Sequence, residues 1–432
     1  MQYPSPFGNR IVRRIKCSRN QQGIAHQTIG QGRVEEPMKH TLPGFFLASL
    51  LALFGAFDML RAGAAEPPAQ PTKPAPAASQ PAAIPQGEGE RKILTGVSQL
   101  TDGSQFLKAG EGYFSPDMKW VIFQGVPKGE SQYQMYVAPL NLPDESAGEP
   151  ARLGRPVRIT PEKSRNTCGF FSPDGKSLIF ASTAGKENPQ DPSAGYQRKD
   201  AVYKWFFPTG MEIYRVDNWM PAISAAGEHK TDLVDLAQPA NRMTDNDAYD
   251  AEDAYSPDGK WICFTSMRTG NGEIFVMHPD GTHVVQITHA KGYNGGPFFS
   301  PDGKRLLYRS DRKGNDLLQL FVSDLAFDAD GNITGIAAEH QLTDDQNVNW
   351  GPYWFPDGHH IIFATSRHGH QNYELYSIRD DGTHDTRITY TDGFDGLPAF
   401  SPDGKYLMWS SKRAPDNSVQ LFLAKFNAPK EW

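Results

Sequence analysis

The sequence predicts an all-β fold, a six-bladed β-propeller of four-stranded antiparallel blades, and three recurring patterns support it. The first is a tight turn of the form Ser-Pro-Asp-Gly-Lys, which occurs, with two variants, six times in the last three-quarters of the 432 residues. In such a turn proline presets φ at the second position, and glycine takes the positive φ that lets the chain reverse. The turn prolines are Pro116, Pro173, Pro257, Pro301, Pro356 and Pro402.

The other two patterns mark the remaining strands of each unit. A short apolar run such as Trp261–Phe264 follows every turn, as expected for a second strand that is buried on both faces. A third strand begins with Gln or Glu before apolar and aromatic residues, as in Glu273–Val276, and a fourth ends in an apolar residue and Thr, as in Ile287-Thr288. Successive turn prolines are 44 to 84 residues apart, which suits single blades with loop insertions.

The two ends of the repeat region predict how the ring closes. After the sixth unit no apolar-Thr ending follows, whereas an extra copy, Ser98–Thr101, precedes the first turn. We therefore expect the N-terminal strand to complete the last blade. Such closure removes the free sheet edges that otherwise favour aggregation.

Three regions are predicted along the chain. Residues 1–64 form a leader and signal peptide whose apolar core is Phe45–Phe57, and the natural start is expected at Met38. Residues 65–92 form a disordered tether rich in Pro and Ala, and residues 93–428 form the propeller. We expect a periplasmic or secreted protein with no stable membrane span after signal cleavage; the alternative is a membrane anchor formed by an uncleaved signal.

Composition excludes some functions. The net charge of −7 comes without a basic stripe, so nucleic acid is not expected as a partner. There is no Gly-x-Ser-x-Gly elbow, His-Glu-x-x-His helix or phosphate-binding glycine loop, so we expect no catalytic residues and no enzyme activity. Cys168 and Cys263 are expected as buried free thiols, and the mature protein as a monomer.

Two sets of residues are expected on one face, because the loop that enters the first strand and the loop that joins strands two and three emerge on the same side of a propeller. The entering loops supply Asp, Asn and aromatic residues, and the exits of the second strands supply arginines. A ring of this kind can bind a peptide or sugar; alternatively, the arginines pair with carboxylates of neighbouring blades. The candidate ligand-binding residues are Asp250, Glu252, Asn294, Trp350, Asp395, Arg268, Arg312 and Arg367.

Two further features have open interpretations. An acidic run enters the third blade and is either a calcium site or a solvated loop with inter-blade pairing; no other cofactor or metal is expected. Its members are Asp245, Asp247, Asp250, Glu252 and Asp253. The insertion of the second blade contains the aromatic segment Tyr203–Pro208, which either caps the channel or contacts a partner, or packs onto the side of the propeller.

The repeats resemble the TolB-type propeller family, to which the periplasmic component of the Tol–Pal envelope system belongs. The resemblance covers residues 93–428 and is strongest in Tyr249–Glu252, Tyr255–Lys260 and Phe394–Gly404. The chain departs from TolB itself in having, before the propeller, a segment too short for the α/β domain that TolB carries there. The resemblance implies a binding propeller without the Tol-specific domain.

We therefore expect a non-enzymatic propeller that binds an envelope protein or peptide through its loop-rich face, related in role to Tol–Pal type envelope maintenance or transport. The competing hypothesis is an enzyme, either a propeller hydrolase or a metal-assisted lactonase. Two further hypotheses remain. The protein is a propeller relative of the prolyl oligopeptidases that lacks the peptidase domain, or it is a structural accessory without a ligand.

Overall fold

The computed structural model describes residues 84–144, 148–184, 197–199, 202–204, 207–229, 231–246, 248–430 and 432. The predicted signal peptide, most of the predicted tether and part of the blade 2 insertion lie outside these residues. No helix in the described part of the chain is long and apolar enough to cross a membrane.

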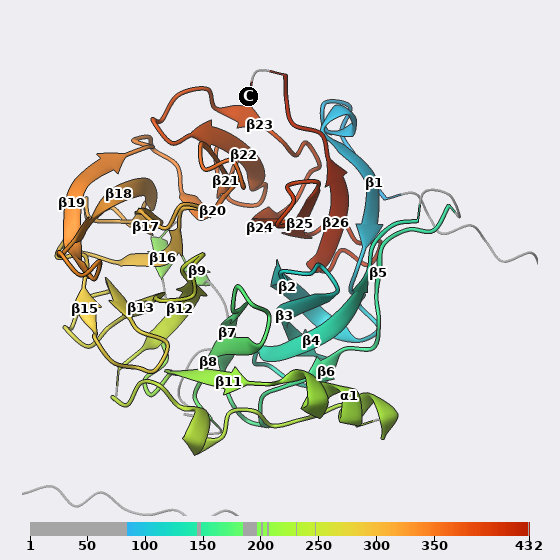
Figure 1. The fold of residues 1–432 in the computed structure, drawn as a ribbon. Coiled ribbons are helices and arrows are strands. Elements are labelled where there is room, and N and C mark those ends of the chain that lie inside the picture. Colours follow the sequence, from blue (N-terminus) through green and yellow to red (C-terminus); the bar gives the residue numbers. More distant parts are fainter. Residues whose placement is uncertain are drawn as a thin grey trace, which may run out of the picture. The chain divides into compact units, whose positions relative to one another are not determined.

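Six antiparallel sheets follow one another around a central channel (Figure 1), which confirms the predicted six-bladed propeller. Blade 1 contains β2 (Phe106–Phe114), β3 (Trp120–Pro127), β4 (Gln134–Asn141), β5 (Arg152–Leu153) and β6 (Val157–Arg158). Blade 2 contains β7 (Asn166–Phe171), β8 (Ser177–Ser182) and β11 (Glu212–Asp217). Blade 3 contains β12 (Asp250–Tyr255), β13 (Ile262–Ser266), β14 (Glu273–Met277) and β15 (Val285–Gln286).

The later blades have the same plan. Blade 4 contains β16 (Asn294–Phe299), β17 (Arg305–Ser310), β18 (Gln319–Phe327) and β19 (Ile333–Gln341). Blade 5 contains β20 (Asn349–Trp354), β21 (His360–Thr365), β22 (Glu374–Arg379) and β23 (Thr386–Arg387). Blade 6 contains β24 (Asp395–Phe400), β25 (Tyr406–Ser411), β26 (Gln420–Phe426) and β1 (Leu94–Gln99). The remaining elements are η1 (Glu90–Lys92), β9 (Gln197–Lys199), β10 (Val202–Lys204), α1 (Met220–Glu228) and η2 (Pro239–Asn241).

Blade 2 departs from the four-stranded plan. Its sheet has three strands, and the place of the fourth is taken by a single bridge between Tyr214 and Arg242. The connection that leads there contains α1, whose Ile223 and Ala226 pack into the core beside Trp219. The Thr that marks the fourth strand makes the same contact as in blade 3: the Thr244 hydroxyl accepts a hydrogen bond from the backbone N–H of Ile213 at 3.0 Å, as the Thr288 hydroxyl does from Ile274 at 2.8 Å.

The turns behave as structural corners. In five of them the serine hydroxyl donates to the aspartate, as from Ser172 to Asp174 at 2.7 Å, and the same aspartate accepts the N–H of Lys176 at 3.0 Å. Gly175 has a φ of 70°, the left-handed conformation that glycine adopts without a steric penalty. Each second strand then buries one large aromatic residue seven positions after the turn proline. These fully buried residues are Phe123, Phe180, Phe264, Tyr308, Phe363 and Trp409.

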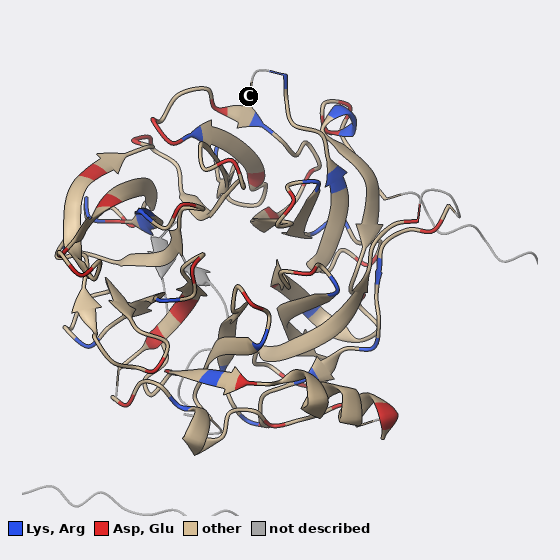
Figure 2. Cartoon of the chain, in the orientation of Figure 1, with Lys and Arg blue, Asp and Glu red and all other residues tan. Residues whose placement is uncertain are grey.

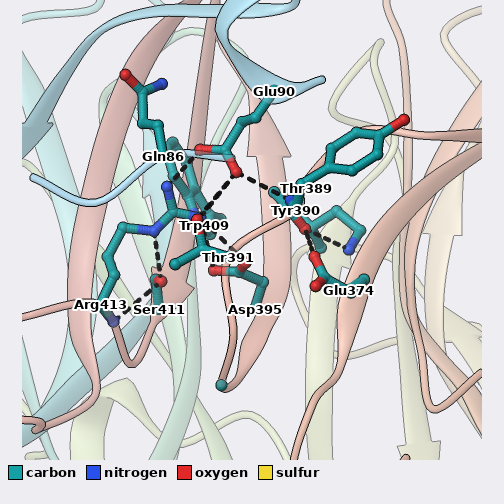
Figure 3. Close-up of polar contacts among 12 residues, drawn as sticks. Gln86, Glu90, Glu374, Thr389, Tyr390, Thr391, Asp395, Trp409, Ser411 and Arg413 are labelled. Atoms are coloured by element: carbon teal, nitrogen blue, oxygen red, sulfur yellow. Dashed lines mark hydrogen bonds and ion pairs between the residues drawn. The ribbon is translucent and has the colours of Figure 1, made fainter. Parts of the chain in front are cut away.

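The ring closes as predicted. β1 pairs antiparallel with β26, and Leu421 N–H donates to the Thr101 hydroxyl at 2.9 Å, as in the apolar-Thr ending of other blades. Residues before β1 add a second connection, because the carboxylate of Glu90 forms an ion pair with Arg413, which also pairs with Asp395 at 3.0 Å (Figure 3). All three side chains are buried.

Candidate functional site: the channel mouth

The innermost strands of all six blades share one irregularity. Their pairing with the second strand shifts at the same place, five residues before the turn proline, and the residue there has φ between 47° and 61°. In blade order these bulge residues are Glu111, Cys168, Glu252, Gly296, Gly351 and Leu397. Positive φ is uncommon for residues other than glycine, so four blades adopt a costly conformation here.

Side chains two positions further along close the channel. They are Tyr113, Phe170, Ala254, Phe298, Tyr353 and Ala399. The Tyr113 ring lies 5.1 Å from the Phe170 ring, and its centroid is 6.0 Å from that of Tyr353, on the other side of the ring of blades. Phe298 lies 5.1 Å from Tyr353. Four aromatic rings thus meet in the channel and form a floor.

A cavity of about 460 Å³ lies on this floor, on the side where the chain enters the innermost strands. Its two halves differ in chemistry. Blades 1 to 3, with Arg309 of blade 4, provide charged groups, namely Lys108, Glu111, Arg165, Glu252, Asp253 and Arg309. Blades 4 to 6 and the end of the blade 2 insertion provide an apolar wall that includes Phe207, Trp350, Phe394 and Leu397.

Glu252 is held by a complete set of donors. Its carboxylate accepts hydrogen bonds from the hydroxyls of Thr265 at 2.6 Å and Tyr293 at 2.6 Å, and from the backbone N–H of Gly296 at 2.8 Å. Arg309 donates to it at 2.6 Å and forms the ion pair that balances its charge. A carboxylate with this many donors has little capacity left for a ligand, so Glu252 mainly fixes the cavity wall.

Glu111 is less well compensated. Burial raises its pKa to about 7, against the opposing effect of hydrogen bonds from Cys168 and Thr167. Among the described residues it forms no ion pair. Burial also raises the pKa of Cys168, and the nearby carboxyl of Glu111 adds to this effect, so the group is a thiol and not a thiolate at neutral pH.

Asp253 has no hydrogen-bond partner from another described residue at either carboxyl oxygen, although its side chain is only 4% exposed and lines the cavity. Burial raises its pKa, and the charges of Glu111 and Glu252 raise it further. The amide oxygens of Gln124 and Gln132, which line the same cavity, also lack partners among the described residues. Unsatisfied buried polar atoms therefore gather at this cavity, whereas folded proteins rarely leave such atoms unpaired.

The residues predicted as a binding ring divide into two groups. Glu252 and Trp350 line the cavity. Asp250, Asn294 and Asp395 are at most 1% exposed and lie where neighbouring blades meet. The Asn294 amide donates to Glu273 of the preceding blade at 3.2 Å and its oxygen accepts from Ser310 at 2.7 Å.

The three predicted arginines do not line the cavity. Arg268 donates to Ser266 at 2.8 Å and pairs with Asp250 at 3.0 Å, within its own blade. Arg312 bonds Asn294 at 3.2 Å and pairs with Glu339 of its own blade. Arg367 pairs with Asp345, in the loop that enters its blade, at 3.3 Å, and with Asp385. The three predicted arginines thus pair within their own blades, whereas Arg309 and Arg305 pair with carboxylates of neighbouring blades. Both charge signs are interspersed around the ring (Figure 2).

The acidic run at blade 3 does not converge. Asp245 pairs with Arg242, Asp250 with Arg268 and Glu252 with Arg309, while Asp247 lies outside the described residues. In the part of the chain that the structure describes, no group of three or more His, Cys, Asp or Glu side chains is placed to hold a metal ion. Of the aromatic segment in the blade 2 insertion, Phe207 stacks on Tyr293 with centroids 5.3 Å apart and, with Pro208, lines the cavity.

Sequence reasoning missed Glu111, Cys168 and Arg309. The signal for the first two was present, because aligning the repeats on the turn proline places Glu, Cys, Glu, Gly, Gly and Leu in one column, five residues upstream. At this aligned position, blades 1 to 3 have Glu, Cys and Glu, whereas blades 4 to 6 have Gly, Gly and Leu. The polar side chains therefore all lie in the half of the channel that blades 1 to 3 form. Arg309 carried no comparable signal.

One known protein-family model matches part of the repeat region. Residues 218–326, from the end of β11 to β18, match the TolB beta propeller domain. The match is thus to a part of the propeller, the end of blade 2, blade 3 and most of blade 4. Among solved structures, a protein assigned as TolB from Agrobacterium tumefaciens is similar, with 19% identity, a TM-score of 0.46, and coverage of 74% of this chain and 91% of the other.

Two further structures share the propeller. TolB from Acinetobacter baumannii has 18% identity and a TM-score of 0.42, and the match covers 77% of this chain and 66% of that one. Oligogalacturonate lyase from Vibrio parahaemolyticus has 13% identity and a TM-score of 0.42, with coverage of 78% and 94%.

Proposed function

We propose that the protein is a non-enzymatic binding propeller of the periplasm or the secreted space, which receives a peptide segment of an envelope protein in the cavity at its channel mouth. The observation that carries this proposal is the set of buried polar atoms on Asp253, Gln124 and Gln132 that have no partner among the described residues and lie around a cavity with one closed end. A ligand that supplies hydrogen-bond donors satisfies these atoms.

The shape and the walls of the cavity favour a chain segment or chain end. The aromatic floor lets a ligand enter from one side only, and the volume of about 460 Å³ suits a few residues. Trp350, which is half-buried and lies 6.1 Å from Phe394, offers an apolar surface for side chains. Aromatic anchors in such pockets often supply a large share of the binding energy.

Selection from a random peptide library on the full-length protein tests the proposal. We expect selected peptides to bind the parent protein and to bind Trp350→Ala at least about tenfold more weakly, which corresponds to the loss of about 1.4 kcal/mol. The matched control is Phe327→Ser, because Phe327 is an exposed aromatic residue on an outer strand. Failure to select any peptide, or equal binding by Trp350→Ala, would contradict the proposal.

An enzyme is the second candidate, and one observation favours it. A carboxyl with a pKa of about 7, as Glu111 has, suits general acid–base catalysis at neutral pH. The neighbouring Cys168 thiol is a poor nucleophile, so the chemistry would be proton transfer. Turnover of a panel of lactones and esters by the parent protein, lost in Glu111→Gln, would support the enzyme and count against a purely binding role.

A further inference from the structure

We propose that the polar half of the cavity binds a primary ammonium group of the peptide, either a lysine side chain or an N-terminal amine, on the carboxyls of Asp253 and Glu111. This inference rests on the proposed peptide-binding function and specifies its ligand.

Asp253 has a buried carboxyl that lines the cavity. A carboxyl that is buried without any partner from another described residue is costly when ionised, and it remains protonated until a cation or donors arrive. Among the described residues, only its own backbone N–H favours the charged form, and burial outweighs this effect and raises the pKa of Asp253. An ammonium group provides a positive charge and three donors. These are the properties that the site lacks.

The charges that act on Asp253 are negative. Besides burial, the charges of Glu111 and Glu252 raise the pKa of Asp253, and the charge of Glu252 raises the pKa of Glu111. Arg309, whose charge lowers the pKa of Glu111, is engaged by Glu252 at 2.6 Å. The other two carboxyls have no ion pair among the described residues. One additional positive charge is therefore accommodated beside Asp253 and Glu111.

Two cationic side chains near the opening, Lys108 and Arg165, restrict the path by which the ammonium group of the ligand enters the cavity. Lys108 lies on β2 and Arg165 directly before β7, each three residues before a bulge residue (Glu111 and Cys168) and about 10 Å nearer the opening at the rise of a β-strand. A four-carbon lysine stem, or the first residue of a peptide, places its charge below this level. The amide oxygens of Gln124 and Gln132 offer acceptors on the way, and the aromatic wall with Trp350 suits both the apolar stem and the cation.

Binding by this route releases protons. The ligand enters as an ammonium ion, and the carboxyls that it pairs with lose to solvent the protons that they hold in the empty cavity. No covalent bond forms or breaks. Calorimetry of the full-length protein at pH 7 in two buffers of different ionisation heat measures this release directly.

Three small probes separate the sources of the amine. N-acetyl-lysine methylamide has only a side-chain amine, leucine methylamide has only an α-amine, and N-acetyl-norleucine methylamide has neither. We expect one of the two amines to bind with proton release and the norleucine compound not to bind. Binding of the norleucine compound with equal affinity, absence of binding by both amines, or binding without proton release would overturn the inference.

Asp253→Asn keeps the shape of the side chain and removes its charge, and because the carboxyl has no partner on another described residue the variant is expected to fold. Loss of a charged hydrogen bond weakens amine binding about 10- to 100-fold. Asp245→Asn, at a position whose side chain is 90% exposed, is the matched control and leaves affinity unchanged. If library peptides bind equally well after their amines are acetylated, the inference fails while the peptide-binding function stands.

Discussion

Glu90 and Arg413 form an ion pair between side chains that are both inaccessible to solvent and lie 323 residues apart in the sequence. Glu90 also accepts the N–H of Tyr390 at 3.0 Å and the hydroxyl of Thr391 at 3.2 Å, both in the segment that leads into blade 6 (Figure 3). The start of the propeller is thus attached to its last blade by buried charge as well as by the pairing of β1 with β26.

Replacing Glu90 by Ala tests the importance of this connection. Among the described residues, the change leaves Arg413 buried with Asp395 as its one remaining ion-pair partner, and breaking one side of a buried ion pair costs about 3–5 kcal/mol. Chemical denaturation should show a loss of that size in the free energy of unfolding. Glu88→Ala, at an exposed position in the same segment, is the control and should change stability by less than about 0.5 kcal/mol. Equal stability of the two variants would show that the pair does not secure closure.

We expect the buried Asn294, which connects blades 3 and 4, to contribute to the stability of the fold. The Asn294 amide donates to the carbonyls of Gly272 at 3.1 Å and Ala290 at 3.0 Å, as well as to Glu273. Asn294→Ala removes these three hydrogen bonds and also the amide oxygen that accepts from the Ser310 hydroxyl, and we expect it to cost about 3 kcal/mol. Asn315→Ala, in an exposed loop of the same blade, should be close to neutral. Thermal unfolding of both variants measures the difference, and a stable Asn294→Ala would show that water replaces these bonds.

The fold was predictable because its signals are local. A Ser-Pro-Asp-Gly turn specifies its own hydrogen bonds, so six copies predict six hairpins, and the missing apolar-Thr ending correctly predicted the pairing of β1 with β26. The outer edge of blade 2 was not predictable, because α1 displaces regular strand pairing there and only the bridge of Tyr214 with Arg242 remains.

The site was only partly predictable, for a physical reason. Polar residues near a channel mouth look alike in sequence whether they face the cavity, as Glu252 does, or the seam between blades, as Asp250 does two residues earlier. The difference depends on the bulge at Glu252, whose positive φ sets where each side chain points. A bulge of this kind is a property of strand pairing and is visible only in the structure.

Trp432 supports a third prediction. Its indole stacks on His360 with centroids 4.3 Å apart, contacts Phe426 at 5.2 Å, and donates to the Ser377 hydroxyl at 3.0 Å. Because the ring is half-buried, its removal in Trp432→Ala should cost about 2 kcal/mol, less than a fully buried tryptophan. Lys430→Ala, exposed in the same tail, is the control. Denaturation midpoints that coincide for the two variants would contradict this role.

The raised pKa of Glu111 predicts how the stability of the protein depends on pH. The folded protein holds a proton on this carboxyl up to about pH 7, whereas the unfolded chain loses it near the ordinary value of 4.5. Between these values folding takes up a proton, so rising pH favours the unfolded state and the contribution of Glu111 to stability falls. Below pH 4.5 and above pH 7 both states have equal protonation, and the contribution no longer changes.

Glu111→Gln removes this dependence, because glutamine does not titrate. Denaturation of parent and variant at pH 4.5, 5.5, 7 and 8 should show the variant gaining stability relative to the parent as pH rises to 7, and then a constant difference. Glu374, whose pKa burial also raises to about 7, titrates in both proteins and cancels in the comparison. A difference that is constant across the whole range would mean that Glu111 is ionised in the folded protein, and the cavity would then hold a fixed negative charge.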